Sequence, residues 1–258
     1  MRYPKQIEEA GFEDLLSIIK AETFEYKRKA MNCAVISLNE DMQNLLSEAS
    51  LNRFIAISNS ITFPLKDVDY DIVSLFGLDN PIDELGRLMQ CWITLGSAVE
   101  AALQIFLSVY LSDFEMSGWH IWDNVNFDEV KNKLFEVINI MEENGEIDKK
   151  QARSLKDMIK KELKSRATLP KLDTIMLFDL IEFYMKTVNW DEEKIQKLTT
   201  IREYRNCIHS FKERDLRKWY ELLDSIKFFC CLILDLQSMM PDADSIISDM
   251  KSNMDYYY

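Results

Sequence analysis

The stretch from Leu198 to Phe211, LTTIREYRNCIHSF, holds polar residues whose types and spacing could carry out chemistry. Read as a helix with about 100° per residue, it places four polar side chains within an arc of about 100°: Arg202, Arg205, Asn206 and His209. The apolar side chains of the same stretch fall in the opposite arc: Ile201, Tyr204, Cys207, Ile208 and Phe211. We therefore expect the polar arc to face away from the core, with His209 on the surface.

These residue types suit cleavage of RNA by attack of a 2′-hydroxyl on the neighbouring phosphate. That reaction needs a group that exchanges a proton near pH 7, which histidine does, and fixed positive charge on the phosphate, which arginine supplies. His209 is the candidate general base or acid, and Arg202 is the candidate phosphate ligand. Arg205 and Asn206 are expected to assist, and no metal ion is required. Because Arg202 and His209 are about 10 Å apart along a helix axis, one helix alone closes such a site poorly.

The string IREYRNCIH resembles the motif of the HEPN family (higher eukaryotes and prokaryotes nucleotide-binding), whose ribonuclease members carry an Arg, four to six residues and a His. Arg202 and His209 have six residues between them and fit this spacing, whereas the Arg205–Asn206 pair lies closer to the histidine. The resemblance implies a helical bundle, and a homodimer in which two such helices form a composite groove. It also implies a metal-independent RNA endonuclease of bacterial toxin or phage-defence type, with RNA as substrate and an antitoxin or sensor protein as partner.

Two other interpretations of the pattern stay open. The polar arc could be the solvated face of an amphipathic surface helix, or it could belong to a non-catalytic HEPN-like module that binds a nucleotide or a protein partner. The nuclease and the binding module differ in the surroundings of the arc. A nuclease needs these side chains in a solvent-open groove, whereas a binding module can hold them in a closed network of ion pairs with acidic residues.

Three charged residues extend the candidate site as substrate-binding groups. Lys212 and Arg214 follow His209 closely and could track a phosphate backbone past it. Glu100 lies in a run from Leu88 to Leu111 that has no other charged residue, and a carboxylate among apolar neighbours needs a partner. Glu100 either caps an internal polar network or pairs with one of the motif arginines, Arg202 or Arg205, and so orients the site.

Composition indicates an all-α protein. The 258 residues are 47% hydrophobic and include only 6 Gly and 5 Pro, while the apolar residues recur mostly at spacings of three and four. The net charge of −13 argues against a protein that binds nucleic acid over its whole surface. Between Asp148 and Arg166, however, eight basic residues face three acidic ones, a net charge of +5. This basic segment is either a solvated face or a contact for RNA or a protein partner.

Helices are predicted over eight segments: 12–31, 39–57, 83–114, 127–143, 147–163, 172–188, a motif helix from about 191, and 215–240. Asn144-Gly145 marks the turn of a helical hairpin, and Asn80-Pro81 opens the longest helix. We divide the chain into an N-terminal helical extension, residues 1–80, and a HEPN-like helical bundle, residues 81–250. A charged helical hairpin is inserted into this bundle at about 127–166.

Several classes of site and location are disfavoured. Five cysteines without a CxxC pair, together with two histidines, predict neither a structural metal site nor a disulfide framework, and we expect no cofactor. Asp67 to Asp71 looks like a calcium loop but lacks the required Gly and Glu. The apolar run of Leu88 to Leu111 could span a membrane, but its polar stripe favours a central bundle helix. We therefore expect a cytoplasmic protein with no membrane partner.

Overall fold

The computed structural model describes residues 3–69, 72–73, 76–119, 121–122, 125–206 and 218–248. Within these residues the chain is helical and contains no strand, so the predicted all-α class is confirmed. The helical elements are α1 (Lys5–Glu8), α2 (Phe12–Ile36), α3 (Glu40–Leu45), α4 (Glu48–Asn59), η1 (Phe63–Leu65), α6 (Pro81–Val109), α7 (Leu111–Met116), α8 (Phe127–Glu143), α9 (Lys149–Ala167), η2 (Leu172–Thr174), α10 (Leu177–Lys186), α11 (Glu192–Arg205) and α12 (Trp219–Met239).

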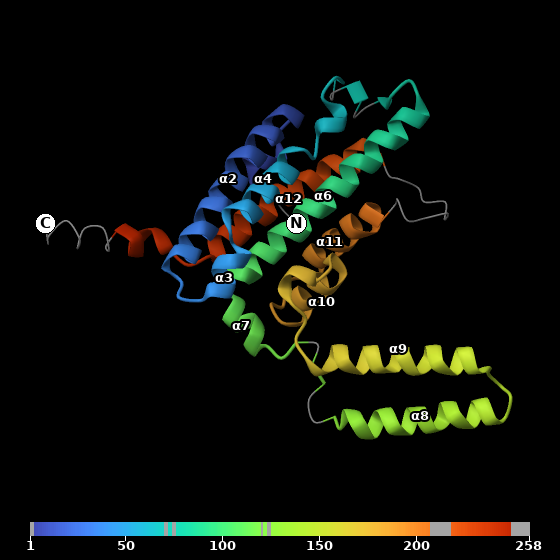
Figure 1. Cartoon of the computed structure of the whole chain (residues 1–258). Coiled ribbons are helices and arrows are strands. Elements are labelled where there is room, and N and C mark those ends of the chain that lie inside the picture. Colours follow the sequence, from blue (N-terminus) through green and yellow to red (C-terminus); the bar gives the residue numbers. More distant parts are fainter. Residues whose placement is uncertain are drawn as a thin grey trace, which may run out of the picture. The chain divides into compact units, whose positions relative to one another are not determined.

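The chain divides into two compact units, and the larger one, unit 1, comprises residues 1–111 and 175–258. In it α2, α4, α6 and α12 run side by side, while α11 packs along α6 and α10 contacts both α6 and α11 (Figure 1). Large side chains fill the centre of this bundle, among them the fully buried Trp92, Tyr26, Tyr184, Phe54 and Phe228. Burial of such apolar area is the main stabilising contribution to a helical bundle of this kind.

The central helix of unit 1 is α6, the longest of the described helices. Asn80 caps it by accepting a hydrogen bond from the Ile82 amide, and Pro81 occupies its first turn, as the sequence predicts. By length and composition α6 is the one helix among the described residues that could cross a membrane. Its most apolar window is 67% buried inside the protein, against α2, α4, α11 and α12. Those neighbours give the apolar side chains of α6 a protein environment.

The N-terminal residues, predicted as a helical extension, are part of unit 1. Helix α2 packs against α4 and α12, and α4 packs against α6, so residues 1–80 share the core of unit 1 with the motif helix. The Tyr26 hydroxyl donates a hydrogen bond to the Ala102 carbonyl, and the Tyr26 ring lies 5.5 Å from that of Phe54. One difference from the prediction is local, because the helix expected over 39–57 is divided at Leu46 and Ser47 into α3 and α4.

Unit 2, residues 112–174, contains the predicted helical hairpin of α8 and α9. Asn144 ends α8, and Gly145 has a φ of +74°, a conformation that glycine adopts at little cost. Asp148 begins α9 with a capping box, because its side chain accepts from the Gln151 amide while the Gln151 side chain accepts from the Asp148 amide. The unit is longer than the predicted insertion of 127–166, since it also takes in the segments before α8 and after α9.

Candidate functional site

Helix α11 contains the first part of the sequence motif. Arg202 and Arg205 lie in its last turn, and Asn206 is its C-terminal cap, with its backbone amide bonded to the carbonyls of Arg202 and Tyr204. At the other end Asp191 caps the helix by accepting from the Lys194 amide. Three residues assigned to the site lie outside the described residues: His209, Lys212 and Arg214. The described part of the site is therefore its arginine half.

Arg205 is paired with Glu100, so α11 and α6 are joined by an ion pair inside unit 1. Arg205 Nη1 lies 2.5 Å from Glu100 Oε2, and Arg205 Nη2 lies 3.1 Å from Glu100 Oε1. Their side chains are only 27% and 20% exposed, and this two-point geometry is the strongest that an arginine and a carboxylate form. The structure thus gives Glu100 one of the two arginine partners that we expected.

Glu100 also connects α6 to the start of α10. The Leu177 amide, in the first turn of α10, donates a hydrogen bond of 2.7 Å to Glu100 Oε2. A carboxylate in this position satisfies a free amide and interacts favourably with the positive end of the helix dipole. Gln104, one turn further along α6, donates to the Ile175 carbonyl just before α10. One carboxylate therefore joins the middle of α6 to the end of α11 and the start of α10.

The expected orientation of Arg205, away from the core, is wrong. Leu198 and Ile201 are fully buried, and the spacing of three and four residues places Arg205 on the same stripe of α11. The aliphatic part of Arg205 crosses α6 at Gly96, where an added Cβ would lie 2.7 Å from Arg205 Cβ and Cδ. The helices approach closely because Gly96 has no side chain. The guanidinium then extends along α6 as far as Glu100.

Arg202 has different surroundings. Its guanidinium carbon lies 5.1 Å from the centre of the Phe178 ring in α10, and Nη2 lies 3.7 Å from the carboxylate of the neighbouring Glu203. Phe178 is 56% exposed, whereas the Arg202 side chain is 23% exposed, about as little as that of Arg205. Between the two arginines, the Tyr204 ring packs 4.8 Å from the buried Trp92 and fixes the rotation of α11. The two arginines therefore differ in their partners, since a carboxylate binds Arg205 at two points and an aromatic ring lies beneath Arg202.

The flank of α11 that faces α12 is acidic. A groove of about 580 Å³ lies between these helices, and its lining includes four acidic residues and one lysine: Glu192, Glu193, Glu221, Asp224 and Lys197. The lysine is already paired with Asp224. A groove with this charge repels phosphate, so RNA would have to reach Arg202 from another side of the helix.

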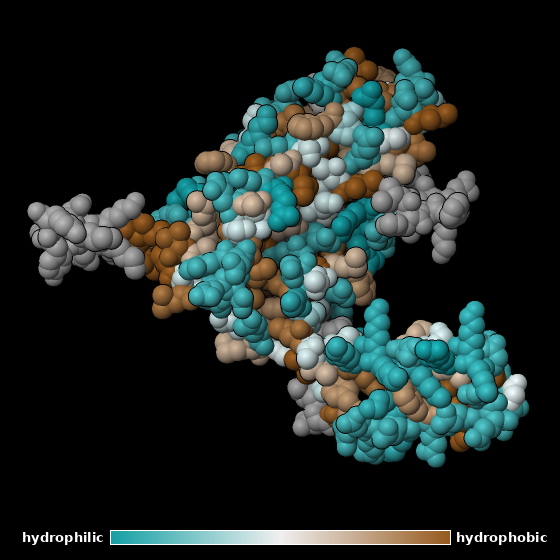
Figure 2. Space-filling view, in the orientation of Figure 1, coloured by the Kyte–Doolittle hydropathy of each residue, from teal (hydrophilic) through white to brown (hydrophobic). Residues whose placement is uncertain are grey.

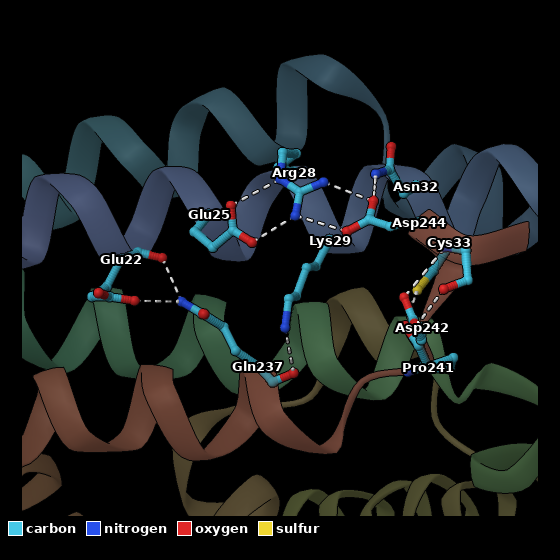
Figure 3. Close-up of polar contacts among 11 residues, drawn as sticks. Glu22, Glu25, Arg28, Lys29, Asn32, Cys33, Gln237, Pro241, Asp242 and Asp244 are labelled. Carbon is cyan, nitrogen blue, oxygen red and sulfur yellow. Dashed lines mark hydrogen bonds and ion pairs between the residues drawn. The ribbon is translucent and has the colours of Figure 1, made fainter. Parts of the chain in front are cut away.

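A polar cluster that sequence analysis did not single out joins α2 to the chain after α12 (Figure 3). Arg28 Nη1 and Nη2 lie 2.7 and 2.8 Å from the two carboxylate oxygens of Asp244, and Arg28 also holds Glu25. Asn32 donates to Asp244 as well, and Lys29 donates to the Gln237 carbonyl. Hydrogen bonds from Arg28 lower the pKa values of Glu25 and Asp244. We name Arg28, Asn32 and Asp244 the C-terminal clasp.

The clasp borders a cavity of about 260 Å³, lined in part by Lys29, Gln237 and Asp242. Every charged member of the clasp is already bound to another member, so the clasp attaches the chain after α12 to α2. Its residues are far apart in the sequence, and no local motif marks them. A basic residue of α2 opposite an acidic residue after α12 would have been recognisable only with the packing of α2 on α12 known.

Among the described residues, no group of three or more His, Cys, Asp and Glu side chains could hold a metal ion. Burial raises the pKa values of the Cys91 and Cys230 thiols to about 12, so these thiols stay protonated near neutral pH. Comparisons of the chain with protein-family models, curated proteins and solved structures found no match. Function has to be inferred from the residues of the chain itself.

Proposed function

We propose that this protein is a metal-independent RNA endonuclease of HEPN type, acting as a homodimer in which Arg202 and His209 of two copies line a composite groove. It would act in the cytoplasm as a bacterial toxin or phage-defence enzyme, and an antitoxin or sensor protein would control it. The sequence resemblance of IREYRNCIH is the basis for the family and for this setting. The structural support comes from the different surroundings of the two motif arginines.

That support is the difference between the partners of Arg202 and Arg205. Glu100 binds Arg205 at two points, whereas Arg202 lies over the exposed Phe178 ring and 3.7 Å from the carboxylate of the exposed Glu203. A guanidinium that is not bound at two points by a carboxylate can form two hydrogen bonds to a phosphate, whereas one in such a pair cannot do so without breaking the pair. Arg202 is therefore the phosphate ligand in this proposal, and Arg205 is a positioning residue. Asn206, at the exposed C-terminal cap, remains an assisting residue, with Lys212 and Arg214 on the substrate backbone.

In the proposed reaction the 2′-hydroxyl oxygen forms a bond to the adjacent phosphorus, and the bond from phosphorus to the 5′-oxygen breaks. His209 takes the proton from the 2′-hydroxyl or gives one to the leaving 5′-oxygen, and its counterpart from the second copy performs the other transfer. Arg202 stabilises the negative charge that develops on the phosphate. The products are a 2′,3′-cyclic phosphate end and a free 5′-hydroxyl end, with atoms and charge conserved.

The test is cleavage of total RNA in excess EDTA by the wild type and by His209→Ala and Arg202→Ala. We expect each variant to lose at least about 100-fold in rate, because proton transfer and charge stabilisation each contribute about that much or more. Arg53→Ala is the control, since Arg53 is an exposed arginine of α4. Circular dichroism and solution mass would confirm that all four proteins are folded and share one oligomeric state.

A non-catalytic binding module is the second candidate, and the closed Glu100–Arg205 pair is the observation that favours it. In that case the folded wild type cleaves none of several RNAs, while Arg202→Ala weakens binding of a nucleotide or RNA. Cleavage that is lost in Arg205→Ala but retained in Arg202→Ala would instead contradict the roles given to the two arginines.

A further inference from the structure

The hairpin of α8 and α9 buries only part of its apolar surface. Ile138 of α8 and Ala152 and Leu163 of α9 are buried where the two helices face each other. Five other apolar side chains of the hairpin remain 37% to 64% exposed: Leu134, Val137, Ile140, Leu155 and Met158. The face of unit 2 seen in Figure 2 is mainly hydrophilic.

Four of these five side chains lie on one side of the hairpin, whereas Ile140, about 160° from the buried Ile138, lies on the outer edge of α8. At about 100° per residue, Leu134 and Val137 are rotated about the axis of α8 by about −40° and −100° from the buried Ile138. Leu155 and Met158 are rotated about the axis of α9 by about −60° and −120° from the buried Ala152, which is the same sense of rotation. Because the two helices are antiparallel, rotation in the same sense from the facing line leads to the same side of the pair. We name these four residues the hairpin strip.

The opposite side of the hairpin is polar. Lys156 donates a hydrogen bond of 2.6 Å to Asn139, and the Lys160 ammonium lies 5.6 Å from the centre of the Phe135 ring. These contacts also fix the register of the two helices. Phe135 lies four residues before Asn139 in α8, and its partner Lys160 lies four residues after Lys156 in α9. Val137 is therefore level with Met158 along the hairpin.

We propose that the hairpin strip binds the strip of a second copy of this chain, forming a four-helix bundle with α8 of one copy over α9 of the other. Two helices cannot enclose a core by themselves, and a second pair supplies the missing layer. A two-fold axis parallel to the helices gives this arrangement. It stacks every helix on an antiparallel neighbour and puts Val137 over Met158 of the partner subunit.

Charge selects this pairing over the alternative one. Helix α8 has five acidic and two basic residues, a net charge of −3, whereas α9 has eight basic and two acidic residues, a net charge of +6. Stacking α8 on α9 of the partner puts opposite charges side by side along both edges of the interface. A two-fold axis perpendicular to the helices would stack α8 on α8 and α9 on α9, which brings like charges together.

The area of this face suits a weak, reversible dimer. Helices of 17 and 19 residues are about 25 Å long, and two of them present a face about 20 Å wide. Each copy would bury about 500 Å², or about 1,000 Å² in total, which is the lower limit for a specific interface. We therefore expect association that depends on protein concentration, and that weakens at high salt because charge selects the partner helix.

Single cysteines test the pairing in the full-length protein. Val137→Cys and Met158→Cys replace exposed side chains, so neither change disturbs the buried core. Mixed and mildly oxidised, the two variants should form a disulfide dimer with one chain of each kind, because a disulfide needs Cα atoms within about 7 Å. Each variant alone, and the wild type with its native cysteines, should give little of this product. Equal cross-linking of Val137→Cys with itself would overturn the arrangement.

Solution mass provides the second readout. Val137→Asp places a charge in the strip and should halve the mass measured by light scattering at concentrations where the wild type associates. Leu38→Asp is the matched control, since Leu38 is 99% exposed in unit 1, and it should leave the mass unchanged. A wild type that is monomeric at all concentrations, or a Val137→Asp mass equal to that of wild type, overturns the proposal. RNA cleavage is measured in a separate experiment, so a wild type that dimerises but cleaves no RNA would contradict only the nuclease proposal.

Discussion

Glu100 brings together three helices through one carboxylate. It comes from the middle of α6, binds Arg205 of α11 at two points and accepts the Leu177 amide at the start of α10. Removing one partner of a pair with little exposure leaves the other without compensation, which costs more than the pair itself contributes. Glu100 is therefore expected to matter for stability before it matters for any reaction.

Glu100→Gln should lower the free energy of unfolding by about 1–3 kcal/mol, below the full cost of breaking a buried pair because both side chains remain partly exposed. Urea denaturation followed by circular dichroism measures this change. Glu203→Gln is the control, since Glu203 is 61% exposed, and should change stability by less than about 0.5 kcal/mol. Equal effects of the two substitutions would show that the Glu100 pair contributes nothing beyond a surface contact.

At this scale the sequence predicted that Glu100 needs a partner, because a carboxylate stands out in an apolar run. It did not predict the side on which Arg205 lies. Arginine is polar at its tip and apolar along its stem, so a helical wheel assigns it to the solvated arc while the stem packs on α6. That packing is possible because residue 96 is a glycine. The helix that packs on it, α11, is more than 90 residues further along the chain, so local sequence does not reveal the contact.

The contact between α6 and α11 depends on a single missing side chain. Gly96 lets the stem of Arg205 lie against the backbone of α6, and the same contact directs the guanidinium to Glu100. Glycine inside a helix costs about 0.5–1 kcal/mol relative to alanine, so its presence here needs a compensating reason. The close approach of α11 is that reason.

Gly96→Ala should destabilise the protein by about 1–3 kcal/mol even though alanine is the better helix former, because the new Cβ overlaps the Arg205 stem. Gly86→Ala, in the same helix, has nothing within 4 Å of the added Cβ and should stabilise by about 0.5–1 kcal/mol. Thermal unfolding of both variants gives the comparison. Stabilisation by both substitutions would mean that α11 moves away from α6 at no cost.

Element boundaries were predictable where the sequence carries a cap. Asn80-Pro81, Asn144-Gly145 and Asp191 each mark a helix end that the structure also has. The division between α3 and α4 was missed because it has neither Gly nor Pro. Ser47 begins α4 there without a side-chain capping bond, so the local signal was weak. In α12 the predicted start at residue 215 lies outside the described residues, which place the helix from Trp219.

At the scale of the whole molecule, the two ends of unit 1 are joined through the C-terminal clasp. Arg28 and Asn32 lie in α2, whereas Asp244 follows α12, so the clasp connects residues more than 200 positions apart. For the same reason residues on both sides of position 80 belong to unit 1. Helical periodicity shows that residues 12–59 have an apolar face, but it does not show which later helix covers that face.

The clasp should loosen in acid. Hydrogen bonds from Arg28 lower the pKa values of Glu25 and Asp244 below their ordinary values of 4.5 and 3.8. Lowered values mean that the stabilisation is complete above the ordinary pKa values and is lost as the pH falls through the lower values of the folded protein. Amide hydrogen exchange of residues 241–248, corrected for intrinsic rates, should therefore accelerate below about pH 4.

Asp244→Asn should give faster exchange in the same segment already at neutral pH and a smaller acceleration in acid. Asp67→Asn serves as control, since Asp67 is an exposed residue of the connection before α6, and it should behave as wild type. If Asp244→Asn exchanges as slowly as wild type at pH 7, the segment is held by its other contacts and the clasp adds nothing.

The order of the helices along the chain has a kinetic consequence. Helix α6 ends at Val109, but α11 and α12, which cover much of it, are complete only at residues 205 and 239. At about 5–20 residues per second, a ribosome needs on the order of ten seconds to supply them. During that interval the hairpin of unit 2 can already form from neighbouring segments, whereas α6 still exposes apolar surface. The nascent chain is then most open to aggregation at α6, and a chaperone that shields this helix would raise the yield of folded protein.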